Sequence, residues 1–210
     1  MNVELLTCQR MTAGLVYPPY PLQPPQVNQI YTDISVRYPF QSLQHLPDGA
    51  RMANPAGDFF IRATLMQINE GVDFFPSSKE RAIDLFQIAQ ERLRVPQFTV
   101  FGIKLTALLP LQEQKNAAAL LEHAALDKIE NNLELLGPGR QGVGLRIVLH
   151  QDGIRELKIE PFFKDLSQLY IELDVQHPTA FNDVSTVEPW MDSAYDYLFR
   201  EVKGFLETLS

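Results

Sequence analysis

The segment YIELDVQHP, residues 170–178, carries side chains whose types and spacing suit chemistry. Alternation along a strand places Glu172 and Asp174 on one face, about 7 Å apart, and His177 follows just past the expected strand end. Two carboxylates and an imidazole, with Asp183 further on, suit a divalent metal or acid–base work. The same residues also describe a solvent-facing strand of alternating charge, and no H-x-H, H-x3-H or E-x-x-H spacing supports a metal. We therefore predict a binding site at most, without a catalytic residue, a metal or a cofactor.

Three cations stand alone in apolar strand patterns, namely Arg62, Lys104 and Arg146. If these strands are neighbours, the cations pair with Glu172 and Asp174 across one face of a sheet. Such a cross-strand ladder stabilises the sheet, or it forms the polar floor of a pocket covered by a helix. We favour the plain cross-strand interpretation and retain Arg62 and Arg146 as candidate binding residues.

Two further motifs carry less chemistry than their letters suggest. GPGRQG, residues 137–142, matches the dinucleotide-binding pattern G-x-G-x-x-G, which requires a strand before it and a helix after it. Here a predicted helix precedes the motif and a predicted strand follows, so a helix C-cap and loop are expected. Cys8 lies in LLTCQRM, which matches no cysteine-protease signature, and is expected to be a buried or incidental thiol.

Composition excludes several classes of protein. The formal net charge of −8 and the pI near 5.0 argue against binding to nucleic acid or to anionic membranes, which require basic surfaces. A single cysteine excludes an intramolecular disulfide and a cysteine-rich zinc site. Neither a signal-peptide pattern nor an apolar run long enough to span a membrane is found. A cytoplasmic protein is the expectation.

Hydrophobic periodicity gives the expected order of elements. Period-two alternation predicts strands, and apolar residues at spacings of three and four predict helices. Strands are expected over residues 28–40, 58–68, 72–76, 97–111, 142–150, 154–163 and 168–176, and helices over 79–95, 113–136 and 187–209.

This order, ββ(β)α-β-α-βββα, predicts an α+β fold with a mainly antiparallel sheet covered by helices. Asp152-Gly153 between two alternating runs is a strong hairpin signal. Residues 26–210 are expected to form a single domain. The shared order of strands followed by a helix suggests two related halves, 26–111 and 139–210, joined by a long helix, although no residue-level repeat is found.

The N-terminal residues 1–25 end in a proline-rich stretch, with five prolines between Pro18 and Pro25. Each Pro-Pro pair forces the preceding residue out of helical conformation, which favours an extended arm. PPYP resembles a WW-domain ligand, and a flexible linker is a third possibility. Apolar residues on both sides favour an arm packed on its own domain or on a neighbouring subunit.

Aromatic residues at both ends of the chain suggest an interface. Tyr17 and Tyr20 lie in the arm, and Trp190 and Tyr197 widen the apolar stripe of the last helix. Aromatic surfaces of this kind usually belong to the core, and any part left uncovered would suit a dimer interface. We therefore predict a homodimer and possibly a protein or peptide partner, with these four residues at interfaces.

The order of patterns in the second part of the chain resembles a known family. FTVFGIKLTALLPL after a helix, then a long helix, a hairpin, LYIELDVQ and LFREVKGFLETL resemble a sporadically distributed family of uncharacterised prokaryotic α+β proteins of about this size. The resemblance covers residues 56–208. The chain departs from it at FGIKLTALLPL, which lacks the Arg and Asn of the family's VGLR-x-x-N phrase. The resemblance implies an α+β fold and assigns no functional residue.

The functional prediction is a non-catalytic binding or protein-interaction module that acts as a homo-oligomer. An alternative is a small-molecule or metal-dependent enzyme that uses Glu172, Asp174 and His177. A binder of extended peptides at an edge of the sheet is a further alternative, which requires a long unblocked edge strand.

Overall fold

The computed structural model describes residues 1–112, 116–126 and 141–209. It confirms the α+β class with a mainly antiparallel sheet, and all pairings between neighbouring strands are antiparallel. The nine strands of its sheet are Thr7–Val16 (β1), Ser42–Leu46 (β2), Gly49–Asn54 (β3), Gly57–Arg62 (β4), Leu65–Gly71 (β5), Val100–Pro110 (β6), Leu145–His150 (β7), Ile154–Pro161 (β8) and Gln168–His177 (β9). The α-helices are Pro24–Arg37 (α1), Phe75–Leu93 (α2), Ala117–Leu126 (α3), Val187–Tyr197 (α4) and Lys203–Glu207 (α5).

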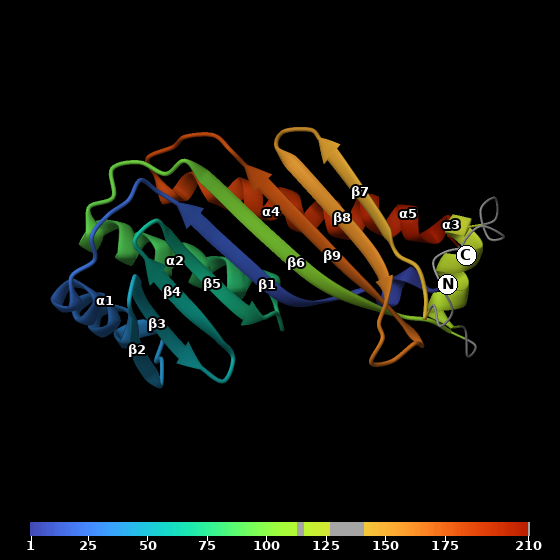
Figure 1. Cartoon of the computed structure of the whole chain (residues 1–210), viewed down its shortest axis with the longest axis horizontal. Helices are drawn as coiled ribbons and strands as arrows, with labels where there is room; N and C mark the ends of the chain where they lie inside the picture. The colour runs from blue at the N-terminus through green and yellow to red at the C-terminus, as the bar shows by residue number, and fades with distance from the viewer. Residues whose placement is uncertain (113–115, 127–140, 210) are drawn as a thin grey trace.

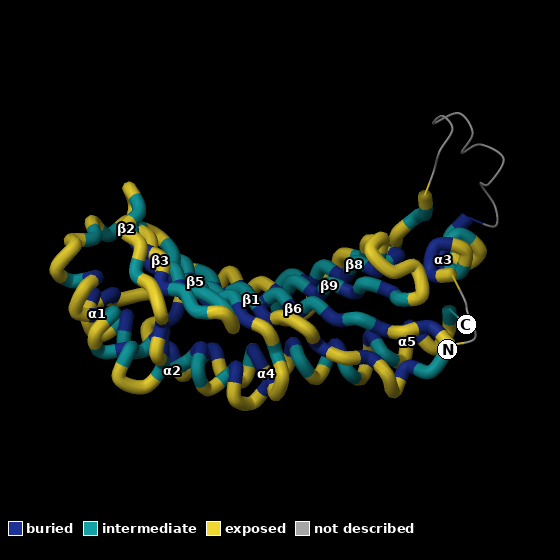
Figure 2. Tube along the Cα trace, turned by 90° about the horizontal axis from the view of Figure 1, so that it is seen from below, coloured by how far each residue is buried: buried dark blue, intermediate teal, exposed yellow. Residues whose placement is uncertain are grey.

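The strands lie in the spatial order β2-β3-β4-β5-β1-β6-β9-β8-β7, as Figure 1 shows. The sheet curves, and α1, α2, α4 and α5 cover its convex face (Figure 2). The first strand of each half, β1 and β6, meet antiparallel at the centre of the sheet. None of the described helices is long and apolar enough to cross a membrane.

Alternation along the strands sorts side chains between the two faces of the sheet. In β6 the buried residues Phe101, Ile103 and Leu105 alternate with partly exposed Gly102 and Lys104. The buried set points toward the helices and joins one hydrophobic core that runs under both halves of the chain. Its largest fully buried side chains are Phe59, Phe86, Phe98, Phe101, Met11, Leu15, Ile30, Ile34, Met52, Ile61, Met66 and Ile68.

The prediction of an N-terminal arm over residues 1–25 is wrong for its first part. Residues 7–16 form β1, which lies between β5 and β6. Met11, Ala13 and Leu15 are fully buried. Their alternation is too short to indicate a strand beside the proline-rich stretch that follows. That stretch does lie on the chain's own domain, since the Tyr20 amide donates to the Ala63 carbonyl at 2.8 Å.

The prediction of a strand over residues 28–40 is also wrong, because Pro24–Arg37 is helix α1. Proline is tolerated in the first turn of a helix, and Gln23 and Gln26 form a capping box there. Ile30 and Ile34 share one parity and also lie four residues apart, so they satisfy a helical pattern as well. Both side chains are fully buried when the segment is helical, so tertiary packing decides its structure over the local pattern.

Other expected elements are confirmed or divided. The predicted strand over residues 58–68 is divided between β4 and β5, and residues 72–76 lead into α2 instead of forming a strand. The β7–β8 hairpin has Asp152 at φ 49° and Gly153 at φ 128°, as the Asp-Gly signal predicted. Of the helix expected over 113–136, the described part is α3, and residues 113–115 and 127–136 lie outside the described residues. The motif at 137–142 also lies outside them up to residue 140.

The last predicted helix spans α4, a π-helical turn at Leu198–Val202 and α5. The observed order is thus β-α-ββββ-α-β-α-βββ-α. Each half begins with a central strand, so the halves by this order are residues 7–93 and 100–207, not 26–111 and 139–210. A duplication stays a prediction.

Candidate binding face of the sheet

The concave face of the sheet carries no described helix (Figure 2). Every second residue of each strand points toward it. Sheets of this kind leave one face solvated, with polar side chains between the apolar positions of the core. Two features distinguish this face, a network of charged side chains over the second half and a hollow at its centre.

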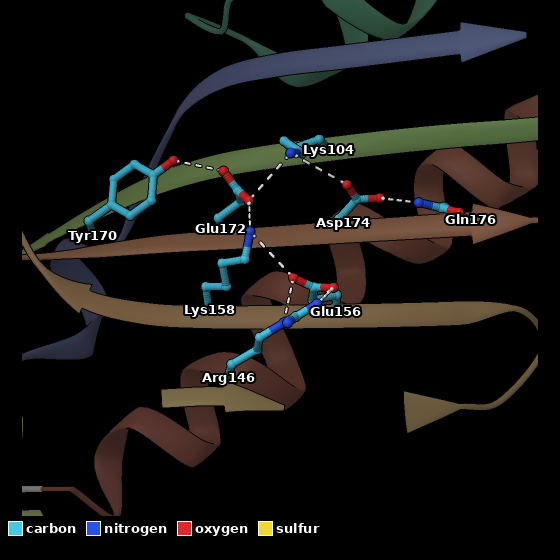
Figure 3. Close-up of polar contacts among 8 residues, drawn as sticks. All are labelled: Lys104, Arg146, Glu156, Lys158, Tyr170, Glu172, Asp174 and Gln176. Carbon is cyan, nitrogen blue, oxygen red and sulfur yellow. Dashed lines mark hydrogen bonds and ion pairs between the residues drawn. The ribbon is translucent and has the colours of Figure 1, made fainter. Parts of the chain in front are cut away.

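Glu172 on β9 is the centre of the charged network, which Figure 3 shows. Its carboxylate accepts hydrogen bonds from Lys158 Nζ at 2.9 Å and from Tyr170 Oη at 2.9 Å. Lys104 on β6 lies between the two carboxylates, at 3.3 Å from Glu172 and 3.5 Å from Asp174. Glu172 and Lys104 therefore pair across neighbouring strands, as the sequence suggested.

The network continues outward to the edge of the sheet. Lys158 lies 3.3 Å from Glu156, and Arg146 on β7 binds Glu156 through two nitrogens, at 2.9 and 2.7 Å. Arg62, by contrast, lies on β4 in the other half and pairs with Asp48 at 3.2 Å. Lys104 therefore pairs with the carboxylates of β9 as predicted, and Arg146 is connected to them only through Glu156 and Lys158. The prediction is wrong for Arg62.

The network determines the charge state of its central carboxylate. Burial alone raises the pKa of Glu172, but hydrogen bonds from Lys158 and Tyr170 and the charge of Lys104 outweigh burial and lower it. Lys104 shows the reciprocal effect, because Glu172 and Asp174 raise its pKa against the opposing effect of burial. At neutral pH Glu172 and Lys104 therefore carry opposite charges and form an ion pair.

His177 does not join the two carboxylates. It lies on the opposite parity of β9, on the helix-covered face, and only 7% of it is exposed. Its ring stacks on Trp190 with centroids 4.5 Å apart, and burial lowers its pKa. The strand is one residue longer than predicted, and His177 therefore continues the alternation toward the core. Among the described residues, no group of His, Cys, Asp or Glu side chains could hold a metal ion.

The hollow lies where β1 and β6 meet. Gly14 and Gly102 are paired directly across the two strands, and Gln67 on β5 and Gln176 on β9 flank them in the same row. Around this row lies a cavity of about 510 Å³, open to the concave face. Apolar and polar side chains share its lining, which consists of Thr12, Gly14, Val16, Leu65, Gln67, Asn69, Val100, Gly102, Ile103, Lys104, Asp174 and Gln176.

Packing does not require glycine at either position of the pair. A Cβ added to Gly102 meets nothing closer than the Val175 carbonyl oxygen at 3.9 Å, and one added to Gly14 meets Leu65 Cδ1 at an ordinary 3.4 Å. Gly57 differs, because its Cβ would lie 2.1 Å from the Asn69 carbonyl oxygen. Glycine inside a strand weakens the strand and often marks a close approach by a ligand or another backbone.

The predicted interface residues are distributed between core and surface. Tyr17 is 2% exposed and its hydroxyl donates to the Arg62 carbonyl, so its assignment to an interface is wrong. Tyr20 is partly buried and accepts a hydrogen bond from Gln26 at 3.1 Å. Trp190 stacks on His177, and Tyr197 lies under the Arg155 guanidinium at 4.6 Å. A role for these three at an interface stays a prediction.

Cys8 is buried near the start of the central strand β1. Burial raises the pKa of its thiol to about 11, against a smaller lowering effect of a hydrogen bond with the Arg10 backbone. A thiol of this kind is almost entirely protonated at neutral pH, and a protonated thiol is a poor nucleophile. The expectation of a buried thiol is confirmed.

Sequence reasoning missed the centre of the concave face. The sequence pattern assigns Gly14 to an N-terminal arm and gives Gly102 no role inside an otherwise apolar strand. Gly102 itself was an available signal, since an isolated glycine in a strand pattern suggests a bulge or a close approach. Its pairing with Gly14 depends on the register of β1 against β6, which the sequence does not provide.

The chain matches no protein-family model, and a search of curated proteins finds no significant match.

Proposed function

We propose that this protein is a non-catalytic binding module that acts as a homo-oligomer in the cytoplasm. Its ligand is a polypeptide segment of a partner protein, which lies across the concave face at the Gly14–Gly102 pair. The observation that carries this proposal is the pair itself. Two directly opposed glycines leave the centre of the face without side chains, although a Cβ fits at both positions.

The chemistry around the glycines favours a polypeptide. Gln67 Nε2 donates to Asn69 Oδ1 at 2.8 Å, and Gln176 Nε2 reaches Asp174 Oδ1 at 3.4 Å. Both amides are thereby oriented, and no contact of the described residues occupies their carbonyl oxygens. A polypeptide backbone supplies N–H donors for such acceptors. Val16 and Val100, paired at one end of the hollow, offer apolar contact to its side chains.

The state of the carboxylates supports a non-catalytic role. A general acid at neutral pH requires a raised pKa, whereas hydrogen bonds to Lys158 and Tyr170 lower that of Glu172 despite its burial. His177, which the enzyme alternative requires, lies on the other face of the sheet.

The proposal is tested by placing a side chain in the hollow and measuring peptide binding. Short random peptides displayed on phage are selected on the wild-type protein, and the dissociation constant of a selected peptide is measured by calorimetry. Gly102→Val places a side chain over the centre of the face, and we expect binding to weaken at least about tenfold, or about 1.4 kcal/mol. Gly71→Val is the matched control, because Gly71 lies on the same face at the end of β5, outside the hollow, and a Cβ there meets nothing closer than the Gln9 carbonyl oxygen at 3.9 Å.

Thermal unfolding of both variants separates loss of binding from loss of structure. We expect Gly102→Val to melt no lower than the wild type, since valine favours strands and the nearest atom to its Cβ is 3.9 Å away. Equal peptide binding by wild type and Gly102→Val, or failure to select any peptide, would contradict the proposal.

A further inference from the structure

Strand β7, Leu145–His150, forms one end of the sheet (Figure 1). It pairs with β8 along one edge, and its outer edge pairs with no other strand of the described chain. The outer backbone N–H and C=O groups of an end strand are a template for pairing with another strand.

Apart from Arg146, which is paired with Glu156, this strand lacks the devices by which proteins protect such an edge. It contains no proline and no lysine, and its register with β8 is continuous over all six residues, without a bulge. Two of its apolar side chains are exposed, Val148 at 47% and Leu149 at 37%. The opposite end strand, β2, instead presents exposed Ser42, Gln44 and His45. An end strand with an exposed apolar side chain on each of its faces, here Val148 and Leu149, is a surface for association.

We propose that two copies of this chain associate by antiparallel pairing of β7 with β7 of the partner, about a twofold axis at Ile147. This assignment supplies an interface for the homo-oligomer proposed above. The side chains of Leu145, Ile147 and Leu149 share one face of the strand. In this register Ile147 lies opposite the partner's Ile147, and Leu145 lies opposite the partner's Leu149. All cross-strand pairs on that face are therefore apolar.

The charges of β7 favour this register over its neighbour. On the concave face it places Arg146 opposite the partner's Val148, so that no like charges are opposed. A twofold axis at Arg146 would instead place Arg146 directly opposite the partner's Arg146, a repulsive pair.

A second copy suits this edge better than an unrelated peptide, because the apolar positions on one face of the strand, Leu145, Ile147 and Leu149, are symmetric about Ile147. Antiparallel pairing of two identical strands brings the apolar side of each against the apolar side of the other. It also keeps the helices of both copies on the same side of one continuous sheet, since a twofold axis normal to the sheet preserves its faces. The two concave faces then adjoin.

Native mass spectrometry and light scattering over a dilution series test the interface. We expect the wild type at twice 23.9 kDa. Val148→Lys places a lysine opposite the partner's Arg146 twice in each dimer, and we expect dimerisation to weaken at least about tenfold. Gln44→Lys makes a comparable change on the other end strand, β2, and we expect the dimer to be unaffected.

A cysteine substitution tests the register and does not depend on the lysine variant folding. Residues directly opposite on antiparallel strands have Cα atoms about 4.5–5.5 Å apart, which a disulfide can bridge. We expect Ile147→Cys to form a covalent dimer under mild oxidation, and Gln44→Cys to remain monomeric in denaturing electrophoresis. The buried Cys8 thiol is present in both variants, so Gln44→Cys controls for it.

Two outcomes would overturn the interface, a wild type that is monomeric at every concentration or a dimer that Val148→Lys leaves intact. The interface and the proposed function fail separately. A monomeric Val148→Lys variant that still binds the selected peptide supports both. Peptide binding that is lost in Val148→Lys and retained in Gly102→Val would assign the edge to extended peptides, and would contradict both proposals.

Discussion

The two halves of the molecule share a scaffold and differ on its surface. Residues 7–93 and 100–207 each begin with a central strand, continue through a helix into consecutive antiparallel strands and end with a long helical segment. The central strands meet antiparallel, so that the halves extend outward from their junction, β1 with β5 to β2 and β6 with β9 to β7. Among the described residues, the first half has one strand more than the second.

The concave face is where the halves differ. Phe60 on β4 lies between two guanidinium groups, Arg51 at 5.6 Å and Arg62 at 5.7 Å from its ring centroid. The corresponding region of the second half is the ion-pair network around Glu172 and Lys158. Side chains that face the helices are constrained by one shared core, whereas those on the concave face are constrained only by their neighbours. The exposed parity of each strand is therefore free to carry different chemistry on the same scaffold.

The same contrast extends to the two ends of the sheet. End strand β2 presents polar side chains and end strand β7 presents apolar ones. The peptide contact and the dimer contact that we propose lie at the junction of the halves and at the second end of the sheet.

The shared core predicts that both halves unfold together. Phe86 on α2 and Leu198 after α4 are both fully buried, one under each half. We expect Phe86→Ala to lower the free energy of unfolding by about 3–5 kcal/mol and Leu198→Ala by about 2–5 kcal/mol. Chemical denaturation followed by fluorescence and by circular dichroism should show one transition in each variant.

Exposed alanine substitutions provide the control for this comparison. Glu91→Ala on α2 changes an exposed side chain, and a change within about 0.5 kcal/mol is expected. Two separate transitions in Phe86→Ala, with only the first shifted, would mean that the halves are independent folding units.

The charged network gives the second half an acid sensitivity of its own. Hydrogen bonds to Lys158 and Tyr170 hold the pKa of Glu172 below its usual value against the effect of burial. A lowered pKa in the folded state contributes stability above the unfolded pKa of about 4.3, and this contribution is lost as the pH falls through the folded value. We expect Glu172→Gln to lower the free energy of unfolding by about 1–2 kcal/mol at pH 7.

The difference between wild type and Glu172→Gln should shrink as the pH falls below about 4, because the wild type then also carries a neutral side chain. Urea denaturation at a series of pH values measures this difference. Glu160→Gln, at an exposed position of β8, is the matched control. A constant difference between wild type and Glu172→Gln at all pH values would show that the charge of Glu172 contributes nothing.

Much of the fold follows from periodicity, and the errors have physical causes. The alternation in β6, β8 and β9 and the Asp152-Gly153 turn are local signals, and the strands are where they predict. Strand β1 was missed because it has only three fully buried positions before a proline-rich stretch. Helix α1 was misassigned because Ile30 and Ile34 fit both periods, and only their burial against the sheet distinguishes them.

The candidate site was predictable in its charges and not in its centre. Lys104 and Glu172 stand on the exposed parity of long strands, so their pairing required only that the strands be neighbours. The distance of Arg62 from that network depends on the order of strands in the sheet, which is a long-range property. The opposition of Gly14 and Gly102 depends on register between strands some ninety residues apart in the chain.

The smallest effect is expected at Arg62, which pairs with Asp48 in the first half. Both side chains are about half exposed, at 44% and 50%, and exposed ion pairs typically contribute about 0.2–1 kcal/mol. The Arg62→Ala variant also loses the contact with Phe60, so we expect a decrease of no more than about 0.5–1 kcal/mol in the free energy of unfolding. Urea denaturation at low and high salt measures the change, and added salt should reduce it.

Arg146→Ala is the matched variant in the second half, because its guanidinium is likewise exposed but binds Glu156 through two nitrogens. Glu156 in turn contacts Lys158, so the loss of Arg146 alters the outer part of the network as well as one pair. We expect the larger destabilisation for Arg146→Ala. An Arg62→Ala variant as destabilised as Arg146→Ala would mean that the Arg62–Asp48 pair is coupled to its neighbours as strongly as Arg146 is, and the contrast between this single exposed pair and the network around Glu172 would then not hold.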